Sequence, residues 1–239
     1  MTRFRGKTAV VTGGASGIGE SIVRLLVEEE ASVVVADLQA ELGQALAADL
    51  GDSVRFVRAD VANESDVAAA IEAAVEAFGR LDVMCNNAGI VGPDPSIVDV
   101  TVDDYQRTLG VLLLGVILGT KHAARAMIRQ DAGGAIVNTA SIASVQGGLG
   151  PHLYTTAKHA VVGLTRSTAS SGMRERAISS MLVDLSTSVS RFWWFSSGRE
   201  SEPSPQPMSS TLAGIFSCVN ARIVSARILM LNATFRRYH

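Results

Sequence analysis

A tyrosine and a lysine four residues apart, Tyr154 and Lys158, are the side chains in this sequence best suited to acid–base chemistry. On a helix this spacing places both side chains on one face. A phenol, with its ordinary pKa of about 10, is a poor base near neutral pH, and a neighbouring ammonium group favours the phenolate. Ser141, which follows an apolar run, can hold a substrate oxygen beside them. The three residues predict proton exchange with a hydroxyl group, although the same Tyr–Lys spacing also occurs by chance on amphipathic helix surfaces.

A glycine-rich stretch near the start of the chain separates an apolar, β-branched run from a helical pattern of apolar residues. Residues without a Cβ allow backbone N–H groups to approach a ligand, and a helix N-terminus favours a bound pyrophosphate. Taken alone, the pattern also fits an ordinary loop. The residues predicted to form this phosphate site are Gly13, Ser16, Gly17, Ile18 and Gly19.

Asp37 ends a second apolar run, eighteen residues beyond Gly19. A carboxylate at this position can accept hydrogen bonds from both ribose hydroxyls of an adenosine, and it repels a 2′-phosphate. Leu38 follows it rather than an arginine, and Ser16 carries no positive charge. The sequence therefore favours NAD over NADP, while a solvated loop aspartate is the alternative interpretation.

Two more apolar runs end in polar or small residues that suit a dinucleotide. Asp60 can bond an adenine amino group with Val61 beside the ring, and Asn87, Ala88 and Gly89 let the backbone lie close to a ribose. Ordinary turn formation is the alternative interpretation of each group when it is considered by itself, and for Asp60 it fits equally well. In combination with the acid–base residues, they predict hydride transfer to or from a nicotinamide.

The elements that must position these residues alternate between strand and helix over the first two thirds of the chain. This alternation is typical of a single α/β domain, a doubly wound parallel sheet with helices on both faces, whose ligands bind outside the carboxyl ends of the strands. Strands are expected at residues 7–11, 32–37, 54–60, 81–86 and 135–140, and helices at 17–29, 41–50, 64–78, 103–129 and 154–170.

Composition limits the classes of partner. The 239 residues are 47% hydrophobic and carry a formal net charge of −2, which gives no electrostatic signal for nucleic acid or an anionic membrane. Two cysteines, Cys85 and Cys218, do not make a disulfide framework, and Cys85 is expected in the core. A metal site is not expected. The partner predicted is a small alcohol or ketone.

No cationic N-terminus followed by an apolar stretch of signal-peptide length is present, so a cytoplasmic protein is expected. The most apolar run, residues 111–118, contains Gly115 and is too short to cross a bilayer, which predicts a buried helix segment.

These motifs, in this order and spacing, resemble those of the short-chain dehydrogenase/reductase family. The resemblance extends from Phe4 to Arg166 and implies a Rossmann-type fold. It implies that Tyr154 is the acid/base, that Lys158 binds the nicotinamide ribose and favours the phenolate, and that Ser141 orients the substrate. It also implies a homo-oligomer, a dimer or tetramer, formed through the two long helices. Residues 147–152 and 158–161 are similar to members that oxidise secondary alcohols on cyclic or terpenoid skeletons, and His152 and His159 are expected at packing or surface positions.

Leu112 departs from the family pattern, which usually carries an asparagine at this position of the fourth long helix. A leucine cannot hold the water through which the catalytic lysine commonly exchanges protons with solvent. A slower enzyme is therefore expected.

The family signature ends after Arg166. Residues 181–183 can still form a strand, but the expected Pro-Gly is missing, and serines, prolines and an aromatic run at 192–195 follow. The sequence therefore divides into an NAD-binding catalytic domain at 1–185 and an atypical tail at 186–239, part of which reads as linker. A divergent folded lid, a shifted reading frame or altered splice, and a new interaction segment remain alternatives for the tail.

The leading hypothesis is an NAD-dependent oxidoreductase acting on a secondary alcohol or ketone. The alternative is a catalytically impaired dinucleotide-binding protein that serves as a scaffold or partner subunit, which Leu112 and the tail favour. A remnant that folds poorly and binds nothing is the third possibility.

Overall fold

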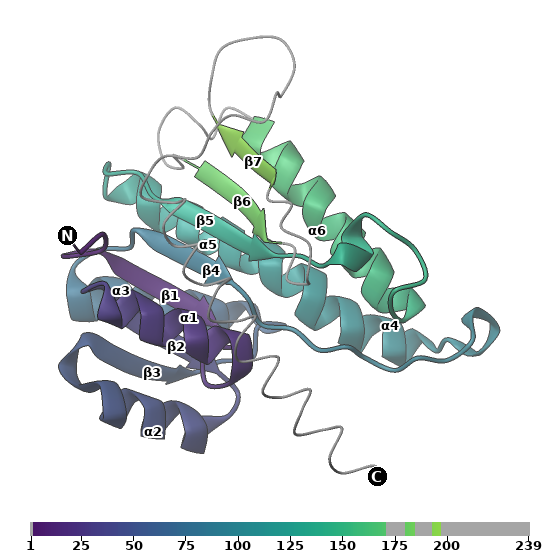
Figure 1. Ribbon diagram of the computed structural model, residues 1–239, viewed down its shortest axis with the longest axis horizontal. Helices are drawn as coiled ribbons and strands as arrows, with labels where there is room; N and C mark the ends of the chain where they lie inside the picture. Colours follow the sequence, from purple (N-terminus) through teal and green to yellow (C-terminus); the bar gives the residue numbers. More distant parts are fainter. Residues whose placement is uncertain (1, 171–179, 185–192, 197–239) are drawn as a thin grey trace.

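One twisted sheet forms the centre of the molecule in the computed structural model, which describes residues 2–170, 180–184 and 193–196. The strand order is β3-β2-β1-β4-β5-β6-β7 (Figure 1). The first six strands pair in parallel, and β7 pairs antiparallel with β6. The strands are β1 (Thr8–Thr12), β2 (Ser32–Asp37), β3 (Val54–Arg58), β4 (Val83–Asn86), β5 (Ala135–Thr139), β6 (Ser180–Asp184) and β7 (Trp193–Ser196).

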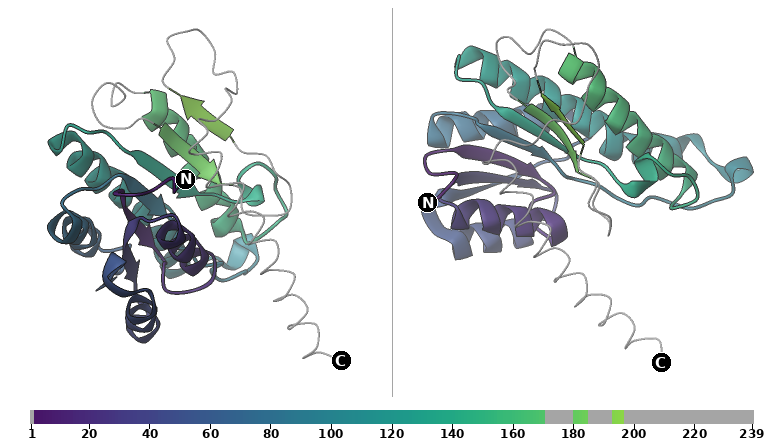
Figure 2. Two further views of the ribbon diagram at one scale, coloured as in Figure 1. Left: turned by 60° about the vertical axis from the view of Figure 1, so that its left-hand side comes forward. Right: turned by 45° about the horizontal axis from the view of Figure 1, so that its top comes forward.

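Helices cover both faces of this sheet, as the alternating pattern predicts. The α-helices are α1 (Gly17–Glu28), α2 (Ala40–Leu50), α3 (Glu64–Phe78), α4 (Val102–Leu109), α5 (Gly115–Arg129) and α6 (His152–Ser170). The short helical turns are η1 (Gly51–Ser53), η2 (Ile97–Asp99), η3 (Gly110–Leu114) and η4 (Ile142–Ser144). Figure 1 shows α1 on the near face of the sheet and α5 on the far face, and Figure 2 shows the same layers from two other directions.

Alternate residues of each central strand enter different cores, because successive strand side chains point to opposite faces. Val10 of β1 packs with Ile71 of α3 and Met127 of α5. Its neighbour Val11 packs on the other face with Val23 of α1 and with Cys85, which is buried as expected. Both faces of this parallel sheet are thus buried from solvent, which explains the continuous apolar runs in the sequence.

The sheet reverses its direction of growth between β1 and β4. The chain builds β1, β2 and β3 toward one edge and then returns to place β4 on the other side of β1. Helices leaving neighbouring strands on opposite sides of such a point open a crevice at the carboxyl ends of the strands. This reversal decides where a ligand site can form.

The long helix expected at 103–129 consists of α4, the π-helical turn η3 and α5, which follow one another without a gap. Val102–Arg129 is long and apolar enough, by length and composition, to cross a membrane, but 56% of its most apolar window is buried inside the fold. Leu112, Val116 and Leu118 lie in the core, which agrees with the expectation of a buried segment. Substantial burial of this kind is typical of a core helix.

The bounds of β2 and α3 are the expected ones, the other predicted elements differ from expectation by at most two residues at either end, and β7 was not predicted as a strand. β3 ends at Arg58 rather than residue 60, because Asp60 turns the chain by accepting a hydrogen bond from the Ala62 N–H at 2.9 Å. β6 lengthens the expected 181–183 strand and pairs in register with β5. β7 comes from the aromatic run assigned to the tail, and the rest of the tail lies outside the described residues.

Candidate active site

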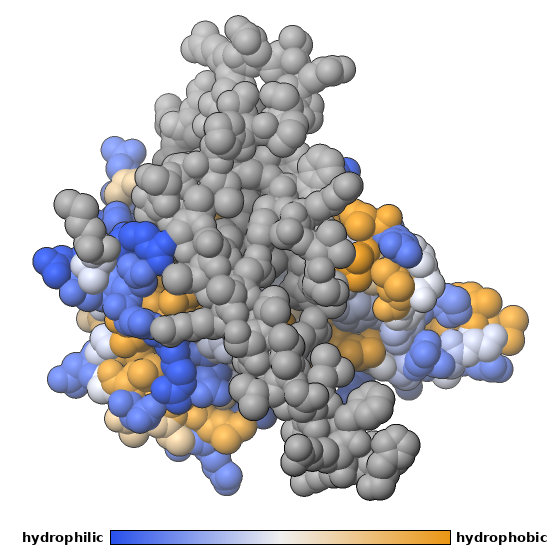
Figure 3. All heavy atoms as spheres, viewed as in Figure 1, coloured by the Kyte–Doolittle hydropathy of each residue, from blue (hydrophilic) through white to orange (hydrophobic). Residues whose placement is uncertain are grey.

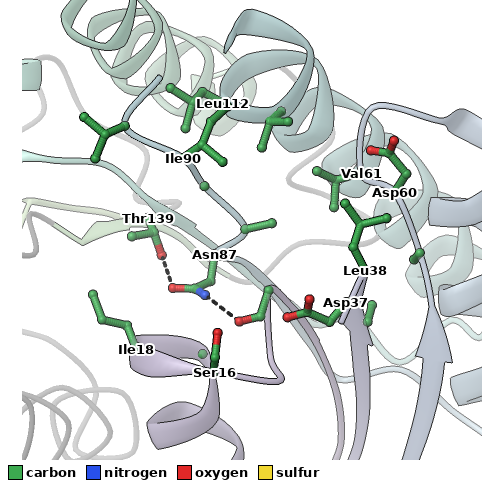
Figure 4. A pocket seen from close by; sticks show the side chains of 18 of the residues that line it. Ser16, Ile18, Asp37, Leu38, Asp60, Val61, Asn87, Ile90, Leu112 and Thr139 are labelled. Carbon is green, nitrogen blue, oxygen red and sulfur yellow. Dashed lines mark hydrogen bonds between the residues drawn. The ribbon is translucent and has the colours of Figure 1, made fainter. Parts of the chain in front are cut away.

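A cavity of about 490 Å³ opens at the carboxyl ends of β1 to β5. All but one of the residues predicted from the sequence line it, and Figure 4 shows how side chains from different strands converge there. These lining residues are Gly13, Ser16, Ile18, Gly19, Asp37, Asp60, Val61, Asn87, Ala88, Gly89, Ser141, Tyr154 and Lys158. The exception, Gly17, is exposed and adopts φ +58° at the start of α1, so it shapes the turn instead.

The glycine-rich turn packs too closely for side chains. Gly13 has φ +63°, and a Cβ on it would lie 2.8 Å from the Ala88 Cα. A Cβ on Gly19 would lie 1.8 Å from the Gly13 carbonyl oxygen. The turn therefore requires glycine on steric grounds, and it brings the α1 N-terminus to the cavity as a dinucleotide site requires.

Thr12, whose role was not predicted from the sequence, fastens the ends of β1 and β4 together. Its Oγ1 accepts hydrogen bonds from the backbone N–H groups of Asn87 at 3.0 Å and Ala88 at 3.1 Å, and the Asn87 Nδ2 donates to the Thr12 carbonyl at 3.1 Å. Figure 4 shows the Asn87 amide between the glycine-rich turn and Thr139. These bonds hold the Asn-Asn-Ala-Gly segment in place as one wall of the cavity.

Asp37 lies at the end of β2 and is 7% exposed. One carboxylate oxygen accepts a hydrogen bond from the Ala15 N–H at 2.9 Å, and the other accepts one from the Gln39 N–H at 3.0 Å. Ser16 and Leu38 lie in the same part of the cavity (Figure 4). The carboxylate is thus fixed in orientation where a ribose would need an acceptor.

Asp60 and Val61 lie in the loop after β3, and both line the cavity. The Asp60 Oδ1 accepts the Ala62 N–H, and the Asp60 N–H donates to the Asp66 carboxylate at 3.0 Å. Asp60 therefore forms a turn, as the alternative interpretation proposed, and it also lines the cavity. Both carboxylates of the cavity lie on this side of it, at the ends of β2 and β3.

Lys158 lies on the opposite side, one helical turn from Tyr154 on α6. Its side chain is 4% exposed, and its Nζ donates a 2.7 Å hydrogen bond to the Thr139 carbonyl. The Nζ lies 5.8 Å from the centre of the Tyr154 ring. Burial lowers the pKa of Lys158 from 10.5 to about 8, because a desolvated ammonium is disfavoured.

Ser141 follows β5 and faces the same cavity. Its Oγ accepts the Ala143 N–H at 3.2 Å, and its own N–H donates to the Ser144 Oγ at 3.0 Å. This reciprocal capping of η4 fixes the serine where the sequence predicts a substrate-orienting hydroxyl. The structure thus brings Ser141, Tyr154 and Lys158 together, whereas His152 and His159 are exposed on α6.

A buried polar chain holds α6 against the sheet. The Asn138 Nδ2 donates to the Thr165 Oγ1 at 3.0 Å, and the Asn138 Oδ1 accepts from the Asn86 Nδ2 at 2.8 Å. Asn138 and Thr165 have no exposed surface. Because buried amides must be paired, these bonds specify one position of α6 along β5. The same helix position delivers Lys158 to the Thr139 carbonyl.

Leu112 lies in the π turn, fully buried, and lines the cavity. Its Cδ2 would lie 3.3 Å from a Cβ added to Gly89, so the leucine packs directly on the Asn-Asn-Ala-Gly wall. Figure 4 shows Leu112 and Ile90 on the Thr139 side of the cavity. Other lining residues that were not predicted from the sequence are Ala36, Leu38, Gln39, Ala59, Ile90, Val91, Val111, Thr139 and Ala140.

A family model for short chain dehydrogenases matches residues 7–186 of the chain. A solved structure from Novosphingobium aromaticivorans, described as a short-chain dehydrogenase, is similar with a TM-score of 0.66 and 35% identity, covering 70% of this chain and 64% of that one.

Plant proteins are more similar in sequence. Sex determination protein tasselseed-2 of Zea mays is 52% identical over 172 residues, which is 70% of this chain and 51% of that protein. Momilactone A synthase of Oryza sativa subsp. japonica is 53% identical over 166 residues, covering 69% and 60%. (+)-Borneol dehydrogenase 2 of Salvia officinalis is 44% identical over 194 residues, covering 78% and 68%. The matched part of the chain thus spans between half and two thirds of the length of most of these relatives.

Proposed function

The chain belongs to the short-chain dehydrogenase family, and we propose that it transfers hydride between NAD and a secondary alcohol or ketone on a cyclic or terpenoid skeleton. The observation that carries this proposal is the convergence of Ser141, Tyr154 and Lys158 on the cavity that the glycine-rich turn also lines. Oxidation of an alcohol needs a proton acceptor at the oxygen and a hydride acceptor at the carbon. NAD, when bound, supplies the second of these, and the three side chains supply the first.

The residues present fit a dinucleotide. The glycines at positions 13 and 19 let the turn pack against backbone that Cβ atoms would strike, and this tight turn leads into the N-terminus of α1 at the cavity. In the proposed complex Gly13, Ser16, Ile18 and Gly19 hold the pyrophosphate. On one side of the pyrophosphate, the adenosine is held by Asp37, Asp60 and Val61. On the other side, the nicotinamide riboside is held by Asn87, Ala88, Gly89 and Lys158.

In the proposed reaction the Tyr154 oxygen takes the proton of the substrate hydroxyl during oxidation and returns it during reduction. The Lys158 Nζ lies 5.8 Å from the centre of the Tyr154 ring, and its bond to the Thr139 carbonyl fixes its position. The Ser141 hydroxyl lies at the end of β5, where it orients the substrate oxygen. Charge is balanced because the proton leaves the oxygen as hydride leaves the carbon.

The proposed substrate class rests on the wall of the cavity and on the relatives. Ile90, Val91, Val111 and Leu112 give it apolar side chains. Such a surface suits a hydrocarbon ring better than a sugar or an acid. Two relatives from Salvia officinalis and Lavandula x intermedia are named as borneol dehydrogenases, which supports the terpenoid-like class.

Asp37 supports NAD rather than NADP in this proposal, because its carboxylate would repel a 2′-phosphate.

A cytoplasmic location and a homo-oligomer are also proposed. Exposed apolar side chains on the α4–α5 helix, Tyr105, Leu114 and Ile117 among them, support association through that helix. The Lavandula relative is named as mitochondrial.

The test is NADH formation with a panel of cyclic secondary alcohols, comparing the unmodified chain with Tyr154→Phe. Loss of the acid/base should reduce kcat by about 10²- to 10⁴-fold. Tyr105→Phe is the matched control, because Tyr105 does not line the cavity and phenylalanine keeps its apolar ring, so the rate should not change. Equal rates for the unmodified chain and Tyr154→Phe would exclude the proposed mechanism.

A catalytically impaired dinucleotide-binding protein is the second candidate, and Leu112 is the observation that favours it. The leucine places an apolar side chain in the cavity wall where the family pattern has an amide. Tight binding of NAD in a calorimeter, without turnover of any alcohol in the panel, would select this candidate over the enzyme.

A further inference from the structure

We propose that Gln39 is a positioning residue that sets the dinucleotide preference by fixing the Asp37 carboxylate and closing the gap between it and Ser16. This inference rests on the proposed function. It assigns a role to a residue that lies two positions beyond the ribose-binding aspartate and that the sequence pattern does not identify.

Three hydrogen bonds carry the inference. The Gln39 N–H donates to the Asp37 Oδ1 at 3.0 Å, and the Gln39 Nε2 donates to the same oxygen at 3.3 Å and to the Ser16 Oγ at 3.1 Å. A carboxylate accepts and cannot donate, so the amide nitrogen of Gln39 must face it. The glutamine side chain is therefore oriented by the carboxylate and reaches across to α1.

The position of Gln39 in the fold is suited to this bridge. Gln39 precedes the first turn of α2, where a side chain commonly caps the helix, but it makes no side-chain cap there. Its amide is turned toward the cavity, which it lines together with Asp37 and Ser16. The side chain is exposed, so it contributes little to the core.

The Asp37 carboxylate is consequently held from two elements. The Ala15 N–H of the glycine-rich turn binds one oxygen, and Gln39 binds the other through both its backbone and its side chain. This arrangement fixes the direction in which the remaining acceptor sites point, which favours the two hydroxyls of an unmodified ribose. An additional 2′-phosphate would have to break the bridge between Gln39 and Ser16 as well as approach a negative charge.

The experiment compares the dissociation constants of NAD⁺ and NADP⁺, measured by calorimetry, for the unmodified chain and Gln39→Met. Methionine keeps the length of the side chain and removes the amide. We expect NAD⁺ binding to weaken about fivefold to tenfold, the scale of the net contribution of one ordinary hydrogen bond. NADP⁺ binding should weaken less or improve, so the preference for NAD⁺ falls. Gln44→Met, on an exposed position of α2, is the matched control and should change neither constant.

A second comparison tests whether Gln39 acts through Asp37. In an Asp37→Ala background, Gln39→Met should change the NAD⁺ dissociation constant less than about twofold, because the group that it positions is gone. The same fivefold to tenfold loss in both backgrounds would overturn the inference. An equal loss for NAD⁺ and NADP⁺ in the single variant would also overturn it, since that is the result of a merely structural role.

The outcomes separate this inference from the proposed function. Failure of the unmodified chain to bind either nucleotide refutes the proposed function and the inference with it. Normal NAD⁺ binding with an unchanged NAD⁺/NADP⁺ preference in Gln39→Met refutes the inference alone. Thermal unfolding of the variant and of Gln44→Met should coincide, which excludes a folding defect as the cause of altered binding.

Discussion

Replacing Lys158 by methionine should make the protein more stable at pH 7 while removing its proposed activity. The ammonium is 4% exposed, and burial lowers its pKa from 10.5 to about 8. That difference corresponds to about 3 kcal/mol of destabilisation when the lysine is charged in the folded state. The charge is retained at a stability cost because the proposed chemistry needs a cation beside Tyr154.

The methionine variant does not recover the full amount. The Lys158 Nζ donates a 2.7 Å bond to the Thr139 carbonyl, and the variant leaves this buried acceptor unpaired at a cost of about 1 to 2 kcal/mol. The expected net change at pH 7 is a gain of about 1 to 2 kcal/mol in the free energy of unfolding. Methionine otherwise fills the same narrow volume.

The pH dependence has a definite sign. At pH 7 both folded and unfolded chains hold the lysine proton, so the full cost of the buried charge is present. Between about pH 8 and 10.5 the folded state releases the proton before the unfolded state does, and the native protein gains stability relative to the variant. This gain is about 1.4 kcal/mol per pH unit, so the native protein becomes the more stable of the two before pH 10.5. Above pH 10.5 the neutral lysine still donates to Thr139, and the difference between the two proteins stays constant.

Urea unfolding followed by circular dichroism from pH 7 to 10.5 measures both curves, and their difference isolates Lys158 from all other titrating groups. Lys121→Met is the control, because Lys121 is an exposed partner of Glu64 and its variant should show no crossing. A Lys158→Met protein that is less stable at pH 7, or whose difference from the native protein is constant with pH, would refute the reasoning.

Leu112→Asn should raise kcat about tenfold, equivalent to about 1.4 kcal/mol of barrier, by returning a polar group to the cavity wall. An unchanged kcat at saturating NAD and alcohol would remove the role assigned to Leu112. Gly19→Ala should abolish NAD binding in a calorimeter, because its Cβ would lie 1.8 Å from the Gly13 oxygen. Gly163→Ala, where a Cβ meets nothing within 4 Å, is the control, and native affinity in the Gly19 variant would contradict the steric argument.

The sheet and its two helical layers were predictable because both faces of the parallel strands are buried. Continuous apolar runs such as Val33–Val35 can form only where water is excluded on both sides, and helical spacing between such runs leaves few alternatives. The ends of the elements were less predictable. β3 ends where Asp60 binds the Ala62 N–H, a choice made by hydrogen bonds and not by hydrophobicity.

The π turn at η3 could not be predicted, since residues 102–129 keep helical spacing throughout. The helix that follows it is tightly packed. The helix approaches the sheet so closely that a Cβ on Gly119 would lie 1.9 Å from the Asn86 Oδ1, and one on Gly115 would lie 3.0 Å from the Val61 side chain. A local widening of the helix leaves its own hydrogen bonds largely intact while it follows such a surface.

The cavity residues that were predicted carry a distinctive type or spacing, whereas a contact that involves a backbone group leaves no such signal. Thr139 binds Lys158 through its carbonyl oxygen, which every residue has, so its side chain gives no indication of this contact. Thr12 receives two backbone N–H groups from a segment more than seventy residues away. Only the packing of β1 beside β4 makes that contact visible.

The family model matches as far as residue 186, beyond the expected end of the resemblance at Arg166, and the sheet continues there because a strand in the middle of a parallel sheet needs an apolar run and not a motif. Met181 and Val183 belong to such a run, and β6 pairs with β5 over its whole length. The aromatic run that follows has high strand propensity and supplies β7. Fold and chemistry therefore depend on different features of the sequence in this region.

Negative and positive side chains line opposite ends of the cavity. Asp37 and Asp60 lie at the ends of β2 and β3, and Lys158 lies across the point where the sheet reverses its growth. In the proposed complex the adenosine hydroxyls therefore belong beside the carboxylates and the nicotinamide ribose beside the ammonium. Gln39 acts at the first position and Leu112 near the second, on elements that do not adjoin. Substitutions there should consequently change dinucleotide preference and turnover independently, and additive effects in the double variant are the signature of that separation.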